Sequence, residues 1–184
     1  MSTRDVAHIA LFAALTAALA VFPPLVLPVI GVPITAQSLG PMLAGAITGP
    51  RRGMWSQVLF LALVALGLPL LAGGRGGLGV FAGPSGGYLV GFAGAALVTG
   101  WLFQRYWDRL NLAYALAFVF AGGIVVIHLL GIAWVSVVTD LSPWQAAVAG
   151  APFLPGDLLK AGTAAVVAVT VRRSYPLMPV PART

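Results

Sequence analysis

The stretch Leu112–Val138, LAYALAFVFAGGIVVIHLLGIAWVSVV, decides the fold class of this chain. It contains no Asp, Glu, Lys or Arg. It is also longer than the roughly 20 apolar residues that an α-helix needs to cross a hydrocarbon core about 30 Å thick. We therefore predict that this stretch is a transmembrane helix.

The composition extends that prediction to the rest of the chain. Of the 184 residues, 60% are hydrophobic and 8% are charged, whereas soluble domains carry about 25% charged residues. So few charges cannot cover the surface of a soluble protein of this size, and lipid must be the solvent for most of it. The sequence contains no cysteine, which excludes disulfides and thiolate chemistry.

We predict an all-α integral membrane protein, a bundle of six transmembrane helices forming a single domain over residues 1–184. The predicted spans cover residues 6–22, 36–48, 54–71, 86–103, 112–138 and 153–171. The second span is short, which favours a tilted or irregular helix. The prolines from Pro23 to Pro33 predict an extended or re-entrant loop, and Ser142-Pro143 predicts the start of a short surface helix.

The basic residues fall mainly on one predicted side of the membrane. That side collects Arg4, Arg51, Arg52, Arg105, Arg109, Arg172, Arg173 and Arg183, and the other side has Arg75 alone. The positive-inside bias then places both termini in the cytoplasm. The net charge of +6 does not indicate nucleic-acid binding, because the cations form no continuous patch.

The first apolar stretch has two interpretations. Arg4 followed by an apolar run and Ala18-Leu19-Ala20 fits a signal peptide with its cleavage site, whose removal would leave five spans and an outside N-terminus. We favour retention, because Ala10, Ala14 and Ala18 recur at helical spacing. Such small residues let helices approach closely. Their spacing fits packing inside the bundle and docking of a partner membrane protein equally well.

Asp157 and Lys160 are the acid–base pair that lies deep in apolar sequence. Each charge near a helix centre costs about 2.5–3.5 kcal/mol on insertion scales, so ionisable residues inside membranes are functional by default. On a helix the two side chains share a face, toward the outer side of the membrane. Two alternatives are an internal ion pair that only locks the bundle and a proton relay, which only His128 is available to extend.

The Gly-rich segment from Gly73 to Gly87 lies on the predicted outer side. Glycines allow positive φ and close backbone approach, so this segment can fold over a ligand, and Arg75 can bind a carboxylate in bidentate geometry. The alternative is a flexible connector. His128 and Trp134 are weaker candidates, since lone histidines and interfacial tryptophans are common packing residues. The sequence assembles no catalytic set or metal-ligand cluster, so we expect no enzyme, no cofactor and no metal.

Three motifs give the chain a specific resemblance. They are Gly73-Gly74-Arg75-Gly76-Gly77-Leu78-Gly79-Val80, Gly83-Pro84-Ser85-Gly86-Gly87-Tyr88 and Pro152-Phe153-Leu154-Pro155-Gly156-Asp157-Leu158-Leu159-Lys160. In these motifs, and in the order and lengths of its spans, the chain resembles the BioY family, the biotin-specific substrate-binding (S) components of energy-coupling factor (ECF) transporters.

The resemblance implies a six-helix S-component fold in the bacterial cytoplasmic membrane that opens outward and binds biotin near the outer face. It implies a membrane-embedded coupling subunit and two cytoplasmic ATPase subunits as partners, with docking through Ala10, Ala14 and Ala18. The candidate biotin-binding residues are Arg75, Gly76, Phe81, Tyr88, His128, Trp134, Asp157 and Lys160.

The chemistry of biotin leaves its orientation open. Asp157 can accept from the ureido N–H groups while Lys160 donates to the ureido carbonyl and Arg75 binds the carboxylate, or Lys160 can bind the carboxylate instead. Two other functions compete with biotin binding. They are a self-sufficient, gradient-driven carrier for another small carboxylate-bearing solute and a structural membrane subunit without a ligand. The sequence also leaves homo-oligomerisation open.

Overall fold

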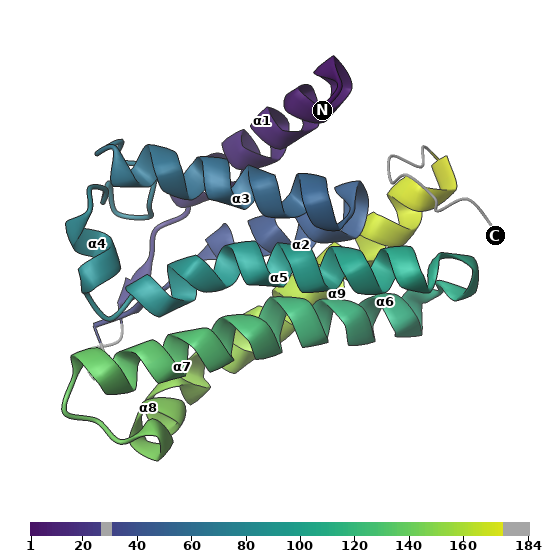
Figure 1. The fold of residues 1–184 in the computed structure, drawn as a ribbon. Helices are drawn as coiled ribbons and strands as arrows, with labels where there is room; N and C mark the ends of the chain where they lie inside the picture. The colour runs from purple at the N-terminus through teal and green to yellow at the C-terminus, as the bar shows by residue number, and fades with distance from the viewer. Residues whose placement is uncertain (27–30, 175–184) are drawn as a thin grey trace.

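The computed structural model describes residues 1–26 and 31–174 and is almost entirely helical (Figure 1). Its α-helices are α1 (Thr3–Ala18), α2 (Leu39–Thr48), α3 (Pro50–Ala65), α4 (Gly79–Ala82), α5 (Gly86–Arg105), α6 (Leu112–Val119), α7 (Ile127–Val138), α8 (Pro143–Gly150) and α9 (Leu154–Ser174). Short 3-10 turns cover Leu19–Val21, Ala36–Ser38, Trp107–Arg109 and Ala151–Phe153, and two short antiparallel strands are β1 (Leu25–Val26) and β2 (Pro33–Ile34).

The prediction of an all-helical protein with helices of membrane-spanning length is confirmed. Four helical segments of the described chain are long and apolar enough to cross a membrane: Thr3–Val21, Gly86–Arg105, Leu112–Val138 and Pro143–Ser174. The count of six crossings is not shown. Helix α2 has 10 residues and so extends about 15 Å at 1.5 Å per residue, and α3, with 16 residues, is also short of a full span.

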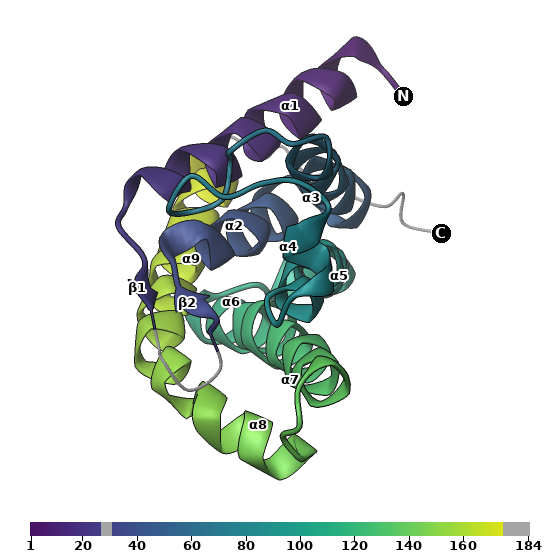
Figure 2. The same cartoon turned by 90° about the vertical axis from the view of Figure 1, so that its left-hand side faces the viewer.

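The short helix α2 is surrounded by other helices of the bundle. Seen from the end that carries the strands and α8, α2 lies inside a ring formed by α1, α3, α5, α7 and α9 (Figure 2). Eight of its 10 residues are buried. It ends at Gly49, whose φ of 87° lies in the left-handed region that suits glycine. Pro50 then starts α3, because its fixed φ fits the first helical position.

The long apolar stretch at 112–138 forms one continuous helical segment with a local change of winding. Residues Phe120–Val126 between α6 and α7 are π-helical. Two small residues there admit close neighbours: Gly122 packs against Thr99 of α5, and Gly123 against Met42 of α2. The predicted surface helix is present as α8, which Ser142 and Gln145 cap with reciprocal hydrogen bonds.

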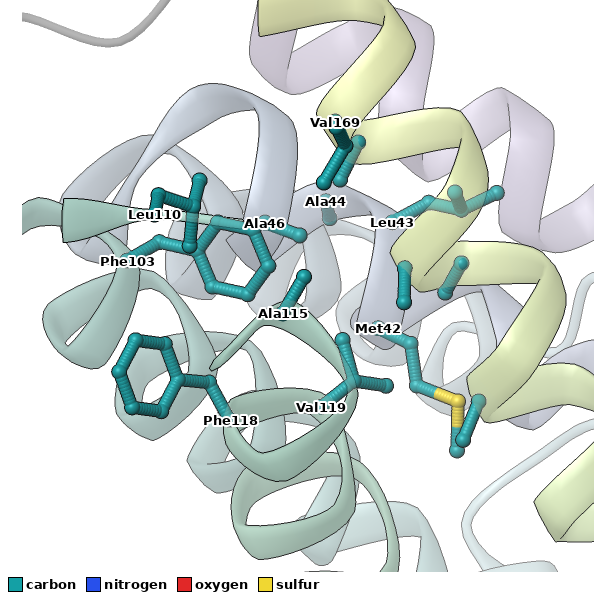
Figure 3. Close-up of a cluster of buried hydrophobic side chains, with 14 of the residues drawn as sticks. Met42, Leu43, Ala44, Ala46, Phe103, Leu110, Ala115, Phe118, Val119 and Val169 are labelled. Carbon is teal, nitrogen blue, oxygen red and sulfur yellow. The ribbon is translucent and has the colours of Figure 1, made fainter. Parts of the chain in front are cut away.

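A buried apolar cluster joins α2, α5, α6 and α9. Phe103 and Phe118 meet edge to face with ring centroids 5.9 Å apart, and Met42 and Val119 fill the space beside the small alanines of α9 (Figure 3). The packing of α5 against the α2–α3 turn needs Gly100, because a Cβ there would lie 2.5 Å from the backbone of Gly49 and Pro50.

The two ends of the bundle differ in charge. The α2–α3 turn, the α5–α6 connection and the end of α9 lie at one end (Figure 1), which therefore carries Arg51, Arg52, Arg105, Arg109, Arg172 and Arg173. The start of α1 belongs to it, since Asp5 pairs with Arg52 at 2.6 Å. The opposite end carries the strands, α4 and α8, and the loop with Arg75 leads into α4. Arg183 lies outside the described residues.

We expect Gly100→Ala to destabilise the bundle by about 1–3 kcal/mol, since the added methyl overpacks backbone that has no room to move. The measurement is the thermal unfolding midpoint of the purified protein in detergent. Gly162→Ala on α9 is the matched control, because a Cβ there meets nothing within 4 Å. Equal midpoints for the two variants would contradict this account of the α5 contact.

Candidate functional site

A cavity of about 60 Å³ lies near the end of the bundle opposite most of the arginines. The segment before α2, the start of α5, α7 and the start of α9 enclose it. Its lining residues are Val32, Pro33, Thr35, Gln37, Ser38, Leu71, Arg75, Ser85, Tyr88, Leu89, Phe92, Ile127, His128, Phe153, Asp157 and Lys160. The walls are mostly apolar, and a few polar groups converge between them, which is the usual composition of a small-molecule site.

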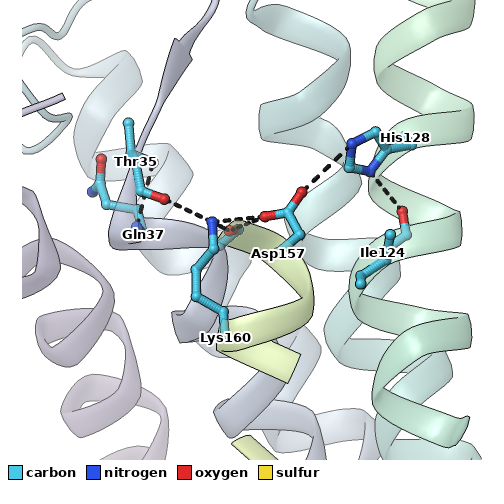
Figure 4. Close-up of polar contacts among 7 residues, drawn as sticks. Thr35, Gln37, Ile124, His128, Asp157 and Lys160 are labelled. Atoms are coloured by element: carbon cyan, nitrogen blue, oxygen red, sulfur yellow. Dashed lines mark hydrogen bonds and ion pairs between the residues drawn. The ribbon is translucent and has the colours of Figure 1, made fainter. Parts of the chain in front are cut away.

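Asp157 and Lys160 form an ion pair on the first turns of α9. Lys160 Nζ lies 2.6 Å from Asp157 Oδ1, and their side chains are 14% and 8% exposed. The ammonium also donates to the Thr35 carbonyl at 2.9 Å and to Ser38 Oγ at 2.7 Å (Figure 4). Since an ammonium has three N–H donors, these three partners use its capacity fully.

His128 of α7 faces the second oxygen of the Asp157 carboxylate. Its Nε2 lies 3.5 Å from Asp157 Oδ2, and its Nδ1 lies 3.0 Å from the Ile124 carbonyl (Figure 4). Because a carbonyl only accepts, Nδ1 carries a proton in this contact. Nε2 is buried without a hydrogen-bond partner.

Tyr88 of α5 adds a second unsatisfied polar atom to the same cavity. Its ring packs edge to face on His128 and tilted on Phe153, with centroids 6.0 and 5.8 Å away. Its hydroxyl is buried without a hydrogen-bond partner. Buried polar groups are rarely left unpaired. Two such atoms in one cavity therefore indicate a place where a ligand or water supplies the partners.

Arg75 reaches the cavity from the Gly-rich loop. Leu71 and Arg75 bond to each other through both backbone groups, which closes a tight turn, and Gly73 and Gly74 adopt φ values of 79° and 70° within it. Arg75 Nε donates to the Ala72 carbonyl at 3.3 Å. Burial lowers the pKa of Arg75 from its ordinary value, but a guanidinium stays charged in proteins, so the loop brings a cation to the cavity wall.

Of the eight predicted site residues, Gly76, Phe81 and Trp134 do not line this cavity. Phe81 and Trp134 border a separate apolar cavity with Gly86 and Gly87. Trp134 Nε1 donates to the Gly83 carbonyl at 2.9 Å, so the indole holds the loop before α5 rather than facing the ligand cavity. Gly76 packs against the Leu68 carbonyl, where a Cβ would clash.

The sequence reasoning missed several polar residues of the cavity. Thr35 and Ser38 bind Lys160, and Ser85 is buried in the wall. The available signal was the polar run Thr35-Ala36-Gln37-Ser38 directly before an apolar stretch, since hydroxyl and amide groups there need partners once buried. Ser85 stands inside the Gly83–Tyr88 motif.

The alanine stripe faces away from the bundle. Ala10, Ala14 and Ala18 are all exposed, whereas Ile9, Phe12, Ala13 and Thr16 on the other face of α1 are buried. Packing of this stripe inside the bundle is therefore excluded. The small residues form a smooth outer face of α1.

Comparison with known proteins gives one consistent result. The BioY family model matches residues 1–177. The chain is 47% identical to a biotin transporter BioY of Rhizobium etli, with 97% of this chain and 98% of that protein covered. It is 46% identical to a biotin transporter BioY of Rhodobacter capsulatus, with 94% and 95% covered.

A solved structure agrees in fold. The crystal structure of the S-component for biotin from an ECF-type ABC transporter superposes with a TM-score of 0.88 at 30% sequence identity, over 94% of this chain and 95% of that chain. With a family model that spans nearly the whole sequence and relatives of such identity, the chain belongs to the BioY family.

Proposed function

We propose that this chain binds biotin and delivers it across the membrane as the substrate-binding component of an ECF-type importer. The observation that carries the proposal is the cavity at the start of α9, where the Asp157–Lys160 pair lies beside the unpaired polar atoms of Tyr88 and His128. The names of the relatives and of the similar structure support biotin as the ligand. Family membership also supports the prediction that the chain is not an enzyme.

The polar groups of the cavity suit the two ends of biotin. The ureido ring has two N–H donors and one carbonyl acceptor. Asp157 and His128 Nε2 can accept from the N–H groups, while Lys160 or the Tyr88 hydroxyl donates to the carbonyl. Arg75 then binds the carboxylate tail, because most of its N–H donors remain available in the described contacts. The apolar walls, with Phe92, Ile127 and Phe153, surround the sulfur ring and the chain.

The size of the cavity implies that it expands on binding. At about 60 Å³ it holds only a few water molecules. The Arg75 loop and the segment that carries Thr35 and Ser38 are the walls with the least helical support. Binding therefore includes an outward movement of one or both. Where Lys160 donates to the ligand, the ligand also replaces one of the three partners of its ammonium.

The rest of the predicted arrangement is part of this proposal. The chain is one transmembrane domain with six crossings, formed by α1, α2, α3, α5, the α6–α7 segment and α9. Both termini are cytoplasmic in the bacterial inner membrane, as the arginines at their end of the bundle favour. A membrane-embedded coupling subunit docks on exposed Ala10, Ala14 and Ala18, and two ATPase subunits complete the importer.

A self-sufficient carrier for another carboxylate-bearing solute gains no support from relatives named as biotin transporters.

We expect Asp157→Asn to weaken biotin binding about 100-fold or more. Removal of one partner of a buried, hydrogen-bonded charge pair typically costs 2–5 kcal/mol, and the variant leaves Lys160 buried without its counterion. Isothermal titration of the purified chain with biotin measures the change. Asp140→Asn is the control, because Asp140 is exposed in the α7–α8 connection. Wild-type affinity in Asp157→Asn would refute the assignment of this cavity.

The orientation of the ligand is tested by comparing biotin with its uncharged amide. If Arg75 binds the tail, wild type prefers biotin over the amide, and Arg75→Gln binds the two about equally, since the bidentate charge contact is gone. Lys160→Met should weaken both ligands but keep the preference for biotin. The reverse pose predicts the opposite pattern, in which the preference survives in Arg75→Gln and disappears in Lys160→Met.

A further inference from the structure

A further cavity lies at the arginine-rich end of the bundle, remote from the ligand cavity. It occupies about 460 Å³ between the start of α1, the α2–α3 turn and the end of α5. In Figure 1 the first half of α1 diverges from α3 at this place. The lining residues are Met1, Asp5, Ile9, Thr48, Pro50, Arg51, Arg52, Trp55 and Gln104.

The side chains of this cavity carry a net positive charge. Arg52 is neutralised by Asp5, with Nε and Nη2 each 2.6 Å from the same carboxylate oxygen. Arg51 is exposed and has no ion pair within residues 1–26 and 31–174. Among the described residues, two arginines against one aspartate leave the Arg51 guanidinium without a counterion at the cavity. A guanidinium offers a planar fork of donors that fits a phosphate in bidentate geometry.

The remaining walls combine aromatic and apolar residues with the polar side chains of Thr48 and Gln104. Trp55 is 48% exposed beside the arginines, and tryptophan is enriched where lipid headgroups meet the hydrocarbon core. Ile9 and Pro50 add apolar surface. One side of the cavity thus suits an anion and the other an acyl or glycerol group, as an amphiphile requires. Basic pockets between transmembrane helices bind anionic headgroups in this manner.

We propose that this cavity binds the phosphate group of an anionic phospholipid from the leaflet at the arginine-rich end of the bundle. Arg51 is the ligand of the phosphate, the Arg52–Asp5 pair fixes the wall behind it, and Trp55 packs on the glycerol region. A free phosphate ion shares the headgroup chemistry but lacks the part that contacts Trp55 and Ile9.

Native mass spectrometry of the delipidated protein in detergent tests the proposal. Dioleoylphosphatidylglycerol and dioleoylphosphatidylcholine have the same acyl chains and differ in headgroup charge. We expect wild type to bind the phosphatidylglycerol about fivefold more tightly, which corresponds to one arginine beside an anionic lipid. Arg51→Gln should remove this difference. Arg109→Gln is the matched control, because it removes the same charge at the same end, outside the cavity. Unchanged biotin binding in Arg51→Gln shows that the variant is folded.

Three outcomes would overturn the proposal. The first is equal binding of the two lipids by wild type. The second is an equal loss of the preference for phosphatidylglycerol in Arg109→Gln and Arg51→Gln, because the preference then depends on the overall positive charge of this end and not on a site at Arg51. The third comes from adding millimolar inorganic phosphate. If phosphate binds in an Arg51-dependent way and abolishes the lipid preference, the source of the anion is free phosphate rather than lipid. None of these outcomes bears on biotin binding, so this proposal fails or holds independently of the transport function.

Discussion

The buried contact between Asp157 and Lys160 is the constraint on which the cavity depends. Two charges in an apolar environment are stable only when geometry and hydrogen bonds satisfy them together, and loss of one partner of such a pair costs about 3–5 kcal/mol. The pair meets this condition through Thr35 and Ser38, which lie more than 100 positions earlier in the chain. Their contact holds the segment before α2 against α9. The same pair thus closes the bundle and presents charge to the cavity.

Gln37 extends this hydrogen-bond network from the segment before α2 to the chain around Leu70 and Ala72. Its Nε2 donates to the Thr16 carbonyl of α1 and to the Leu70 carbonyl, and its Oε1 accepts from the Ala72 amide. The partners of the Gln37 carboxamide in these three bonds are all backbone atoms. The buried side chain therefore fixes the path of the main chain and not the rotamer of a neighbouring side chain. The Gln37 carboxamide therefore links the segment before α2, which binds Lys160, to the Arg75 loop and to α1. A shift of any one of these three elements would therefore break hydrogen bonds to the other two.

How far the sequence predicts the fold and the site depends on the distance over which each signal acts. Local signals predict well: Ser142 with Pro143 indicated α8, and the three-residue spacing placed Asp157 and Lys160 on one face. Contacts between distant segments carry no such signal, so Thr35 and Ser38 were missed, and Trp134 was assigned to the ligand although its indole binds the Gly83 carbonyl. Hydropathy does not settle the number of crossings, because α2 is apolar and other helices bury it.

The π-helical turn at Phe120–Val126 has a consequence for how this protein tolerates insertions and deletions. One residue more or less in a helix rotates everything after it by about 100°. The residues before this turn, such as Phe118, pack in the core, and His128 directly after it faces the cavity. In regular α-helix, a change of length by a single residue would leave the first set in place and turn His128 away. A π-helical turn holds about one residue more than an α-helical turn, so it can lose one residue by returning to α-helical winding. Loss of one residue is therefore tolerated better within the π-helical turn than elsewhere in this helix, and it is also tolerated in the α7–α8 connection, where no phase has to be kept.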